Sequence, residues 1–318
     1  MRKYLARRLV ALVPVIIGVT FAVFMMLNLM PVDPIMMMIT EISSSQTPLM
    51  PHEVTEERYE AMRKEMGLDR PLLVQYGSFL SKAIQGDLGR SFQTRRTVLD
   101  MIVSNAPPTV ALAVAGLGIA VVLGIILGVI AALRRGTWVD AAVMSFSVAG
   151  LSLPSFWLGI MLMLLVSFQW GLLPVVGDAG WRGLILPAFT LGLRAAAVIA
   201  RLTRSSLVEV MNLEYIQTAR AKGLPGRVVM YKHALKNAMV PVITVVGLQF
   251  GSLLSGAVIV ESVFGRPGLG SMAVEAILIK DFPLVQGTVL VLAISYVLVN
   301  LLVDISYVWI DPRIRLEG

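Results

Sequence analysis

The sequence has 318 residues, of which 57 % are hydrophobic and 15 % are charged, and its mean hydropathy is +0.80. A soluble domain carries about 25 % charged residues. The apolar residues also come in blocks long enough to cross a bilayer, which takes roughly 20 residues of helix. The composition therefore excludes an ordinary soluble protein and predicts an integral membrane protein.

The absence of cysteine excludes disulfides, thiolate zinc sites and cysteine nucleophiles. The net charge of +7 would suit nucleic acid. The basic residues, however, gather at the ends of apolar blocks, where they set the topology of a membrane protein. We therefore expect a lipid membrane as the surrounding medium and no nucleic-acid partner.

Six apolar segments, taken in chain order, predict an all-α membrane protein with six transmembrane helices. The first follows a basic start and is too long for a signal peptide, so we expect it to be retained. The segments lie at about 9–30, 107–133, 139–168, 184–204, 238–260 and 284–309.

A polar segment, 31–105, separates the first two apolar segments. Within it, residues 53–68 have helical spacing, and Gly67 with Pro71 would end that helix. We divide the chain accordingly. Residues 1–106 are expected to form the first transmembrane helix plus a periplasmic segment, and residues 107–318 a domain of five transmembrane helices.

The distribution of basic residues predicts the orientation. Six spans place both termini on one side, and that side together with its short loops carries 15 of the 27 basic residues. The opposite side carries 11, eight of them in the long segment 31–105, where charge counts weigh less. Both termini are therefore expected in the cytoplasm.

The loop 205–237 would then face the cytoplasm, and its pattern is that of an ordered segment. Leu213–Lys222 can form a short helix that ends at Gly223, in the usual C-cap position. Pro225 is suited to open a second helix over about Arg227–Lys236.

The second helix would carry an apolar face formed by Val228, Tyr231 and Leu235. Two short helices on a cytoplasmic surface favour a docking site for another protein. An amphipathic helix that lies on anionic lipid fits the same residues equally well. Residue patterns alone leave both interpretations open.

Two stretches of this loop resemble the EAA loop of binding-protein-dependent ABC permeases, in the form found in dipeptide, oligopeptide, glutathione and nickel importers. They are Glu214-Tyr-Ile-Gln-Thr-Ala-Arg-Ala-Lys-Gly-Leu224 and Lys232-His-Ala-Leu-Lys-Asn-Ala-Met-Val-Pro241. Gln217-Thr-Ala219 stands where the general pattern has Glu-Ala-Ala, and Gly223 matches its glycine. His233-Ala-Leu-Lys236 replaces the usual Ile-x-Leu-Pro, as is typical of the peptide branch.

Other motifs resemble the same family along nearly the whole chain. The short loop with Leu173-Pro-Val-Val-Gly177 is similar to glutathione-type permeases. At the end of the first predicted span, Met30-Pro-Val-Asp-Pro34 has Val32 where the family's usual Pro-Gly-Asp-Pro has glycine. The other motifs are Gly86-Asp-Leu-Gly-Arg-Ser91, Arg201-Leu-Thr-Arg-Ser-Ser206, Gly265-Arg-Pro-Gly-Leu-Gly270, Asp281-Phe-Pro-Leu-Val-Gln-Gly287 and Asp311-Pro-Arg-Ile-Arg315.

The resemblance implies a type I ABC importer permease in the bacterial inner membrane, with a coupling helix at about 213–223. It implies as partners a second homologous permease subunit, two ATP-binding subunits and a periplasmic solute-binding protein. The chain has no Gly-x-x-x-x-Gly-Lys-Ser/Thr loop, so ATP and Mg are expected on the partners, and no cofactor or catalytic residue is expected here. The residues implied to couple to the ATPase are Glu214, Tyr215, Gln217, Thr218, Ala219, Arg220, Ala221, Lys222 and Gly223.

The solute implied by the resemblance is a peptide: a dipeptide, an oligopeptide or glutathione. Nickel or another small solute is the alternative within the same family. Two further classes were weighed. An intramembrane protease would need a base near its nucleophile, but no predicted span contains a histidine, and His52 and His233 lie on opposite sides of the membrane. A channel would leave the paired loop helices without a purpose. We therefore expect no catalytic or metal site.

Small residues recur every fourth position in two of the predicted spans. Gly124 and Gly128 lie in the second span, and Gly247, Gly251 and Ser255 lie in the fifth. Such spacing lets helices pack closely, which is the simpler interpretation. The functional interpretation is that the fifth span slides past a neighbour during gating, with Gln249 and Ser252 facing the translocation path.

Arg194 lies inside the predicted fourth span. A charge near the middle of the membrane costs about 2.5–3.5 kcal/mol on insertion scales and is normally kept away from lipid. Arg194 could face a wet cavity as a structural group, or it could bind a peptide carboxylate on the translocation path. Both hypotheses stay open.

Overall fold

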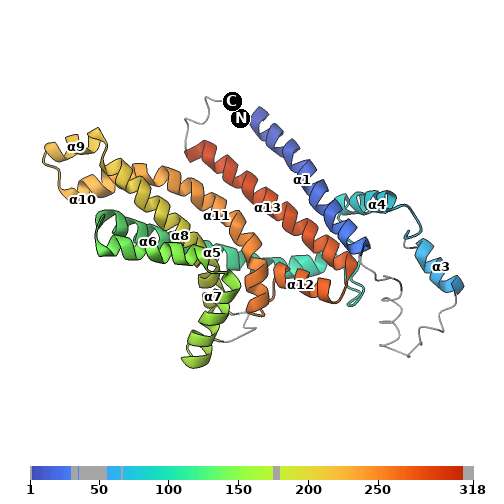
Figure 1. Cartoon of the computed structure of the whole chain (residues 1–318). Helices are drawn as coiled ribbons and strands as arrows, with labels where there is room; N and C mark the ends of the chain where they lie inside the picture. The colour runs from blue at the N-terminus through green and yellow to red at the C-terminus, as the bar shows by residue number, and fades with distance from the viewer. Residues whose placement is uncertain (1, 30–34, 36–55, 66, 175–179, 311–318) are drawn as a thin grey trace. The chain divides into compact units, whose positions relative to one another are not determined.

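The computed structural model describes residues 2–29, 35, 56–65, 67–174 and 180–310 (Figure 1). These residues form helices, contain no β-strand, and include one isolated β-bridge between Arg90 and Thr97. The predicted all-α class is therefore confirmed. The motifs at 30–34 and 311–315 lie outside the described residues, as do His52 and part of the motif at 173–177.

The chain divides into two compact units. The first unit comprises Pro107–Ser271 and Tyr296–Gly318, and the second comprises Arg2–Ala106 and Met272–Ser295. Three helices, α5, α12 and α13, run from one unit into the other. They span Val98–Leu133, Leu269–Leu278 and Phe282–Ile310.

Four helices in the described part are long and apolar enough to cross a membrane, at Val98–Leu133, Arg182–Met211, Gly226–Val263 and Phe282–Val303. They coincide with the predicted second, fourth, fifth and sixth spans. The first helix, α1 (Arg2–Asn28), contributes a shorter apolar stretch, Val13–Asn28. The total of six spans remains a prediction, since the described helices supply four, or five if a bent pair counts as one.

The bent pair occupies the predicted third span, 139–168, so two helices stand where the sequence predicted one. Helix α6 (Trp138–Ser152) is followed by α7 (Ser155–Leu162) and the π-helix η2 (Met163–Gln169), with a bend of 107° between them. Pro154 explains the break, because it has no N–H to donate and it disfavours a helical conformation in the preceding residue. Leu153 is accordingly extended, with φ −79° and ψ 130°.

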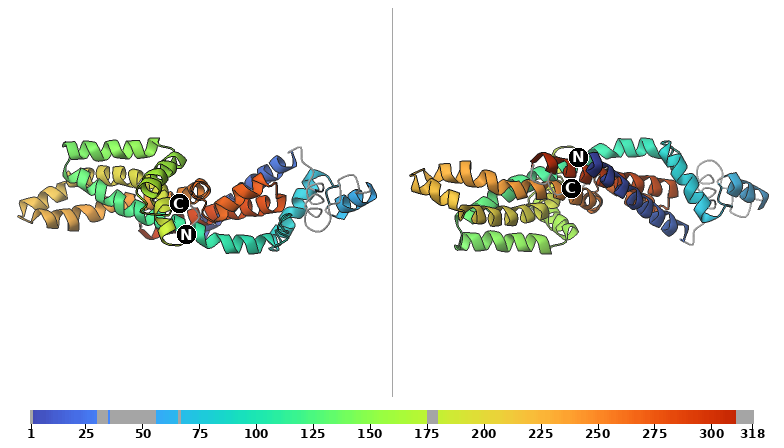
Figure 2. Two further views of the ribbon diagram at one scale, coloured as in Figure 1. Left: turned by 90° about the horizontal axis from the view of Figure 1, so that it is seen from below. Right: turned by 90° about the horizontal axis from the view of Figure 1, so that it is seen from above.

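In the first unit, α8 (Arg182–Met211) lies among α6, α7 and α11 (Lys236–Val263) and contacts all three. Figure 2 shows α6, α8 and α11 side by side from two further directions. The core contains Leu112, Ile199, Val242 and Ala257, each fully buried. Burial of a large aliphatic side chain contributes about 1.5–3 kcal/mol, so this core holds the first unit together.

Close helix packing explains the small residues in α5. A Cβ at Gly124 would lie 2.7 Å from Ile199, and a Cβ at Gly128 would lie 2.6 Å from the carbonyl oxygen of Ala200. Both neighbours belong to α8, so the predicted close packing at these two glycines is confirmed.

Two glycines of α11 likewise allow this helix to pack closely on α13. A Cβ at Gly247 would meet Val303 at 2.7 Å, and one at Gly251 would meet Asn300 at 2.8 Å. Close packing is therefore confirmed at these two positions as well. Ser255 is exposed. Sliding of this helix during gating remains a prediction.

Gly192→Ala is expected to destabilise the first unit. The added Cβ would lie 2.4 Å from the carbonyl oxygen of Gly116, so the backbones of α5 and α8 would have to separate. Overpacking of this kind costs about 1–3 kcal/mol. Gly118→Ala is the matched control, because it also adds a methyl group to a helix but meets no atom within 4 Å. Thermal melting of the purified protein in detergent should separate the two variants. Equal melting temperatures would contradict the close approach.

In the second unit, α4 (Leu72–Ile84) packs on α1. Tyr76 on α4 donates to the carbonyl oxygen of Ile17 at 2.9 Å, and its hydroxyl lies 2.8 Å from Thr20 Oγ1. Its ring centroid is 5.2 Å from that of Phe21 in an edge-on arrangement. Helix α4 was not predicted from the sequence, whereas helical spacing did predict α3 (Glu56–Glu65), whose end at Gly67 has a φ of +69°.

Two of the sequence motifs meet in this unit. Asp281, which is 1 % exposed, accepts hydrogen bonds from the Ser91 hydroxyl and from the backbone N–H of Phe92. Gly287 packs closely against Val98, because an added Cβ would lie 2.5 Å from Val98 Cγ1. The segments 86–91 and 281–287 are therefore parts of one structure, although about 190 residues separate them in sequence.

Candidate functional site

The loop 205–237 carries the most specific sequence signal, and it folds as an ordered cap on one end of the first unit (Figure 1). Helix α8 ends at Met211, and α9 spans Glu214–Ala221. Leu213 is extended, and its carbonyl oxygen accepts the N–H of Ile216 at 3.0 Å. Glu214 in the first turn suits the positive end of the helix dipole.

A Schellman motif ends α9, as the sequence predicted from Gly223. The φ of Gly223 is +79°, in the left-handed region. Its N–H donates to Arg220 O at 2.9 Å, and the N–H of Leu224 donates to Ala219 O at 3.4 Å. These two bonds satisfy carbonyl groups that a helix end leaves without partners. The predicted C-cap is therefore confirmed.

One face of α9 packs on the rest of its own chain. Ile216 is fully buried and Ala219 is 8 % exposed. They join a cluster with Leu207 of α8, and its remaining members are Val229, Met230, Ala234 and Ala238. An eight-residue helix is too short to be stable alone, so this packing holds α9 in place.

Tyr215 adds a polar tether between α9 and the helix that follows it. Its hydroxyl accepts a hydrogen bond from Asn237 Nδ2 at 2.8 Å and donates to the carbonyl oxygen of His233 at 3.4 Å. The outward residues of α9 and its C-terminal turn are exposed. They are Glu214, Gln217, Thr218, Arg220, Ala221, Lys222 and Gly223. The helix is thus fixed on one side and free on the other.

The second predicted helix, about Arg227–Lys236, is not a separate element. Residues Gly226–Val228 form α10, Val229–Leu235 form the π-helix η3, and both continue into α11. Of the three residues of the predicted apolar face, Val228 and Tyr231 are exposed, and Leu235 packs against the buried cluster that contains Val229, Met230 and Ala234. The wider π-turn changes the angle between successive residues, so a pattern of 3.6 residues per turn does not describe this segment. The docking surface itself remains a prediction.

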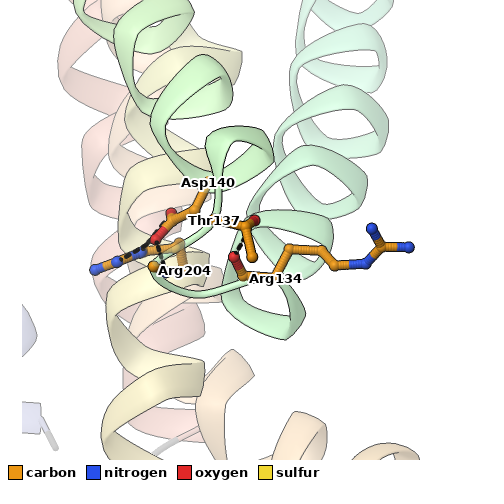
Figure 3. A network of polar contacts seen from close by, with 5 residues as sticks. Arg134, Thr137, Asp140 and Arg204 are labelled. Atoms are coloured by element: carbon orange, nitrogen blue, oxygen red, sulfur yellow. Dashed lines mark hydrogen bonds and ion pairs between the residues drawn. The ribbon is translucent and has the colours of Figure 1, made fainter.

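A bidentate ion pair joins α6 to α8 (Figure 3). Arg204 Nη2 lies 2.7 Å from Asp140 Oδ2, and Arg204 Nε lies 3.1 Å from Asp140 Oδ1. The side chain of Asp140 is 8 % exposed, and its Oδ2 also accepts the N–H of Gly136. The Arg201–Ser206 motif therefore anchors α8 to the start of α6, close to the end of α8 that leads into α9. This pair was not predicted, because its only signal in the sequence is a single acidic residue at the start of an apolar block.

A second buried carboxylate organises the Gly265–Gly270 motif. Glu261 is fully buried, accepts the Thr109 hydroxyl at 2.6 Å and accepts the N–H of Gly270 at 2.8 Å and of Ser271 at 3.2 Å. The N–H of Leu269 donates to Thr109 Oγ1. Glu261 and Thr109 thus cap the start of α12, where a negative charge is favoured.

The three residues suggested for the translocation path lie on two helices. Arg194 is exposed, whereas its neighbours on both sides along α8 are buried. On α11, Gln249 is half-buried and Ser252 is exposed. Within the described residues, no hydrogen bond joins Arg194 to either of them. Arg194 thus has an exposed side chain, and the grouping of the three residues on one path remains a prediction.

The fold is shared with chains of two ABC transporters of known structure. A chain of the MetNI methionine ABC transporter, in inward-facing conformations, matches with a TM-score of 0.56 at 21 % identity, covering 66 % of this chain and 96 % of that one. A chain from the crystal structure of an amino acid ABC transporter with histidines matches with a TM-score of 0.53 at 15 % identity. These matches show a fold that this chain shares with chains of ABC transporters.

Sequence comparison gives the family. Residues 124–316 match the binding-protein-dependent transport system inner membrane component, and residues 1–113 match the N-terminal part of the membrane component of such systems. The chain belongs to this family and is a transport subunit, not an enzyme. It is 41 % identical over 315 residues to the glutathione transport system permease protein GsiC of Escherichia coli strain CFT073, covering 99 % of both chains. Identity to the same protein of strain K12 is 40 %.

Proposed function

We propose that this chain is a permease subunit of an ABC importer that carries short peptides, glutathione among them, across the bacterial inner membrane. The observation that carries this proposal is the 40–41 % identity to glutathione permeases over 99 % of both chains. The similarity extends over the whole length of the chain. It therefore includes the segment 31–105, which would face the solute-binding protein, and the loop 205–237, which would face the ATP-binding subunits.

The coupling element in this proposal is α9, which docks on an ATP-binding subunit and passes its movement to the helices of the membrane. The way in which α9 is held supports this role. One face of α9 is fixed by Ile216, Ala219 and the Tyr215 tether, while the opposite face is exposed. Ala219 then contributes by packing on its own chain, and the exposed residues of α9 and its C-terminal turn contact the partner.

The proposed assembly contains a second homologous permease, two ATP-binding subunits that hold ATP and Mg, and a periplasmic solute-binding protein. Six spans with both termini in the cytoplasm would place α9 on the ATPase side and residues 31–105 on the outer side. Arg194 would face the translocation path and attract carboxylates, because it is exposed on an otherwise buried stretch of α8. Gln249 and Ser252 would line the same path.

Uptake by the reconstituted complex tests this function. The chain would be co-expressed with its cognate permease, ATPase and binding-protein partners and placed in proteoliposomes. We expect ATP-dependent accumulation of labelled glutathione or a labelled dipeptide, and none of labelled Ni²⁺. Uptake of Ni²⁺ without uptake of peptide would favour the nickel alternative instead. Solute flux that persists without ATP would contradict an importer.

A further inference from the structure

The second unit contains a cavity of about 250 Å³. One wall is a face of α4 with Gln75, Ser78, Phe79 and Lys82, at helical spacing i, i+3, i+4 and i+7. The other walls come from the end of α1, the start of α13 and the turn at 86–89. The cavity therefore lies where the motifs 86–91 and 281–287 meet, and the coupling function uses neither motif.

Three charged side chains line this cavity: Arg70, Lys82 and Asp87. In the part of the chain that the structure describes, neither Arg70 nor Lys82 forms an ion pair. Asp87 Oδ1 accepts the N–H of Gly89 at 2.9 Å. The charged lining thus has two cations and one carboxylate, and its net charge is positive.

Four of the apolar residues of the lining are aromatic. Phe24, Phe79, Phe92 and Phe282 all border the cavity. Phe24 and Phe282 are 4 % and 7 % exposed, so they form fixed walls. Aromatic walls with a few placed polar groups are typical of sites that bind small organic molecules. A lone inorganic anion would leave both Asp87 and these rings without a role.

We propose that this cavity binds a short peptide that carries two carboxylates and one ammonium group. The proposal rests on peptide import as the proposed function and assigns the second unit a solute site of its own. Arg70 and Lys82 each bind one carboxylate, Asp87 binds the ammonium group, and the aromatic walls contact the peptide backbone. A guanidinium suits this role because its fork matches a carboxylate.

The size of the cavity supports a ligand of two or three residues. Small-molecule pockets occupy about 300–1,000 Å³, and this one lies just below that range. Glutathione has the required charges at neutral pH. A dipeptide with neutral side chains has one carboxylate fewer, so it would leave one of the two cations without a partner and bind more weakly.

Binding measured without the solute-binding protein tests the site directly. Equilibrium dialysis of labelled glutathione would use the purified complex of permease and ATPase subunits. We expect Arg70→Gln and Lys82→Gln each to weaken binding about tenfold, because each removes a charge-assisted hydrogen bond. Arg96→Gln is the matched control: it removes an exposed positive charge in the same unit but does not line the cavity. Equal affinities in all variants would overturn the proposal.

The role of Asp87 has its own test. Asp87→Asn should weaken the binding of glutathione but leave unchanged the binding of N-acetylated glutathione, which has no ammonium group. Equal loss for both ligands would show that Asp87 does not contact the ammonium group, and the assigned binding mode would fail.

Uptake assays separate failure of the site from failure of the proposed function. If the wild-type importer accumulates glutathione while Arg70→Gln and Lys82→Gln bind it normally, the site is overturned and the transport function stands. If the wild-type importer accumulates no peptide, the proposed function fails. A native phospholipid that copurifies with the wild type, disappears from the Arg70→Gln/Lys82→Gln variant, and is accompanied by no peptide binding would overturn the peptide assignment in favour of lipid.

Discussion

Glu261→Ala is expected to destabilise the first unit by about 2 kcal/mol or more, because two of the donors that lose their acceptor are buried. The carboxylate accepts three hydrogen bonds, from the Thr109 hydroxyl and from two backbone N–H groups at the start of α12. Each buried donor that loses its acceptor costs about 1–3 kcal/mol. The truncation also leaves a cavity in a fully buried position, which adds to the loss.

Two variants make the Glu261 experiment specific. Glu261→Gln keeps the size and one carbonyl oxygen, so it should lose less stability than Glu261→Ala. Glu209→Ala removes an exposed carboxylate of α8 in the same unit and should change little. Thermal and denaturant melting of the purified protein in detergent would rank the three. If Glu261→Ala melts like Glu209→Ala, the carboxylate does not hold α12 in place.

The neighbouring glycines support the same assignment. A Cβ at Gly268 would lie 2.3 Å from the Glu261 carboxylate, and a Cβ at Gly270 would lie 2.3 Å from Val258 Cα. The Gly265–Gly270 motif thus needs glycine because its backbone approaches a buried acid. The motif is recognisable in the sequence, but the span predicted at 238–260 ends one residue before Glu261, so hydropathy does not indicate this buried acid.

Features that depend on local chemistry were predictable from the sequence. The positive φ at Gly223 follows from helix-capping rules, because other residues pay a steric penalty there. The four long apolar helices follow from hydropathy, because length and composition alone decide whether a helix can cross a bilayer. The close packing at Gly124 and Gly128 follows from small residues at a spacing of four.

Features that depend on direction or on distant contacts were not predictable. Hydropathy gives the length of a span but not its direction. The 107° bend after Ser152 was therefore not predicted, even though Pro154 marks its position. The contact between Ser91 and Asp281 joins residues 190 positions apart, and no local pattern indicates it. The π-helix at Val229–Leu235 was not predicted either, because a π-turn alters the period that the pattern assumes.

Gly223→Val is expected to abolish transport while the membrane helices still insert. No atom lies within 4 Å of a Cβ at this position, so the side chain itself meets no clash. The effect comes from the backbone, whose φ of +79° is strongly unfavourable for valine, by roughly 1–2 kcal/mol. The Schellman bonds would open and α9 would lose its fixed end. Gly223→Asn tolerates the left-handed region better and should keep more activity.

Ala219→Asp should have the same outcome through packing. Ala219 lies in the buried cluster with Ile216 and Leu207, where a carboxylate finds no partner and is costly to bury. Helix α9 would no longer pack on the buried cluster. The ATP-binding subunits would then detach, or they would hydrolyse ATP without moving solute. Copurification of those subunits, ATP hydrolysis and solute uptake would be measured for Ala219→Asp and Gly223→Val together.

The matched control separates docking on a protein from docking on lipid. Ala221→Asp introduces the same charge on the exposed side of α9, so it should leave the fold of the loop intact. If α9 docks on an ATPase, Ala221→Asp weakens copurification without loss of stability, whereas Ala219→Asp lowers both. If α9 only rests on lipid, all three variants should leave subunit association unchanged. Normal uptake by Ala219→Asp or Gly223→Val would show that the coupling element lies elsewhere in the chain.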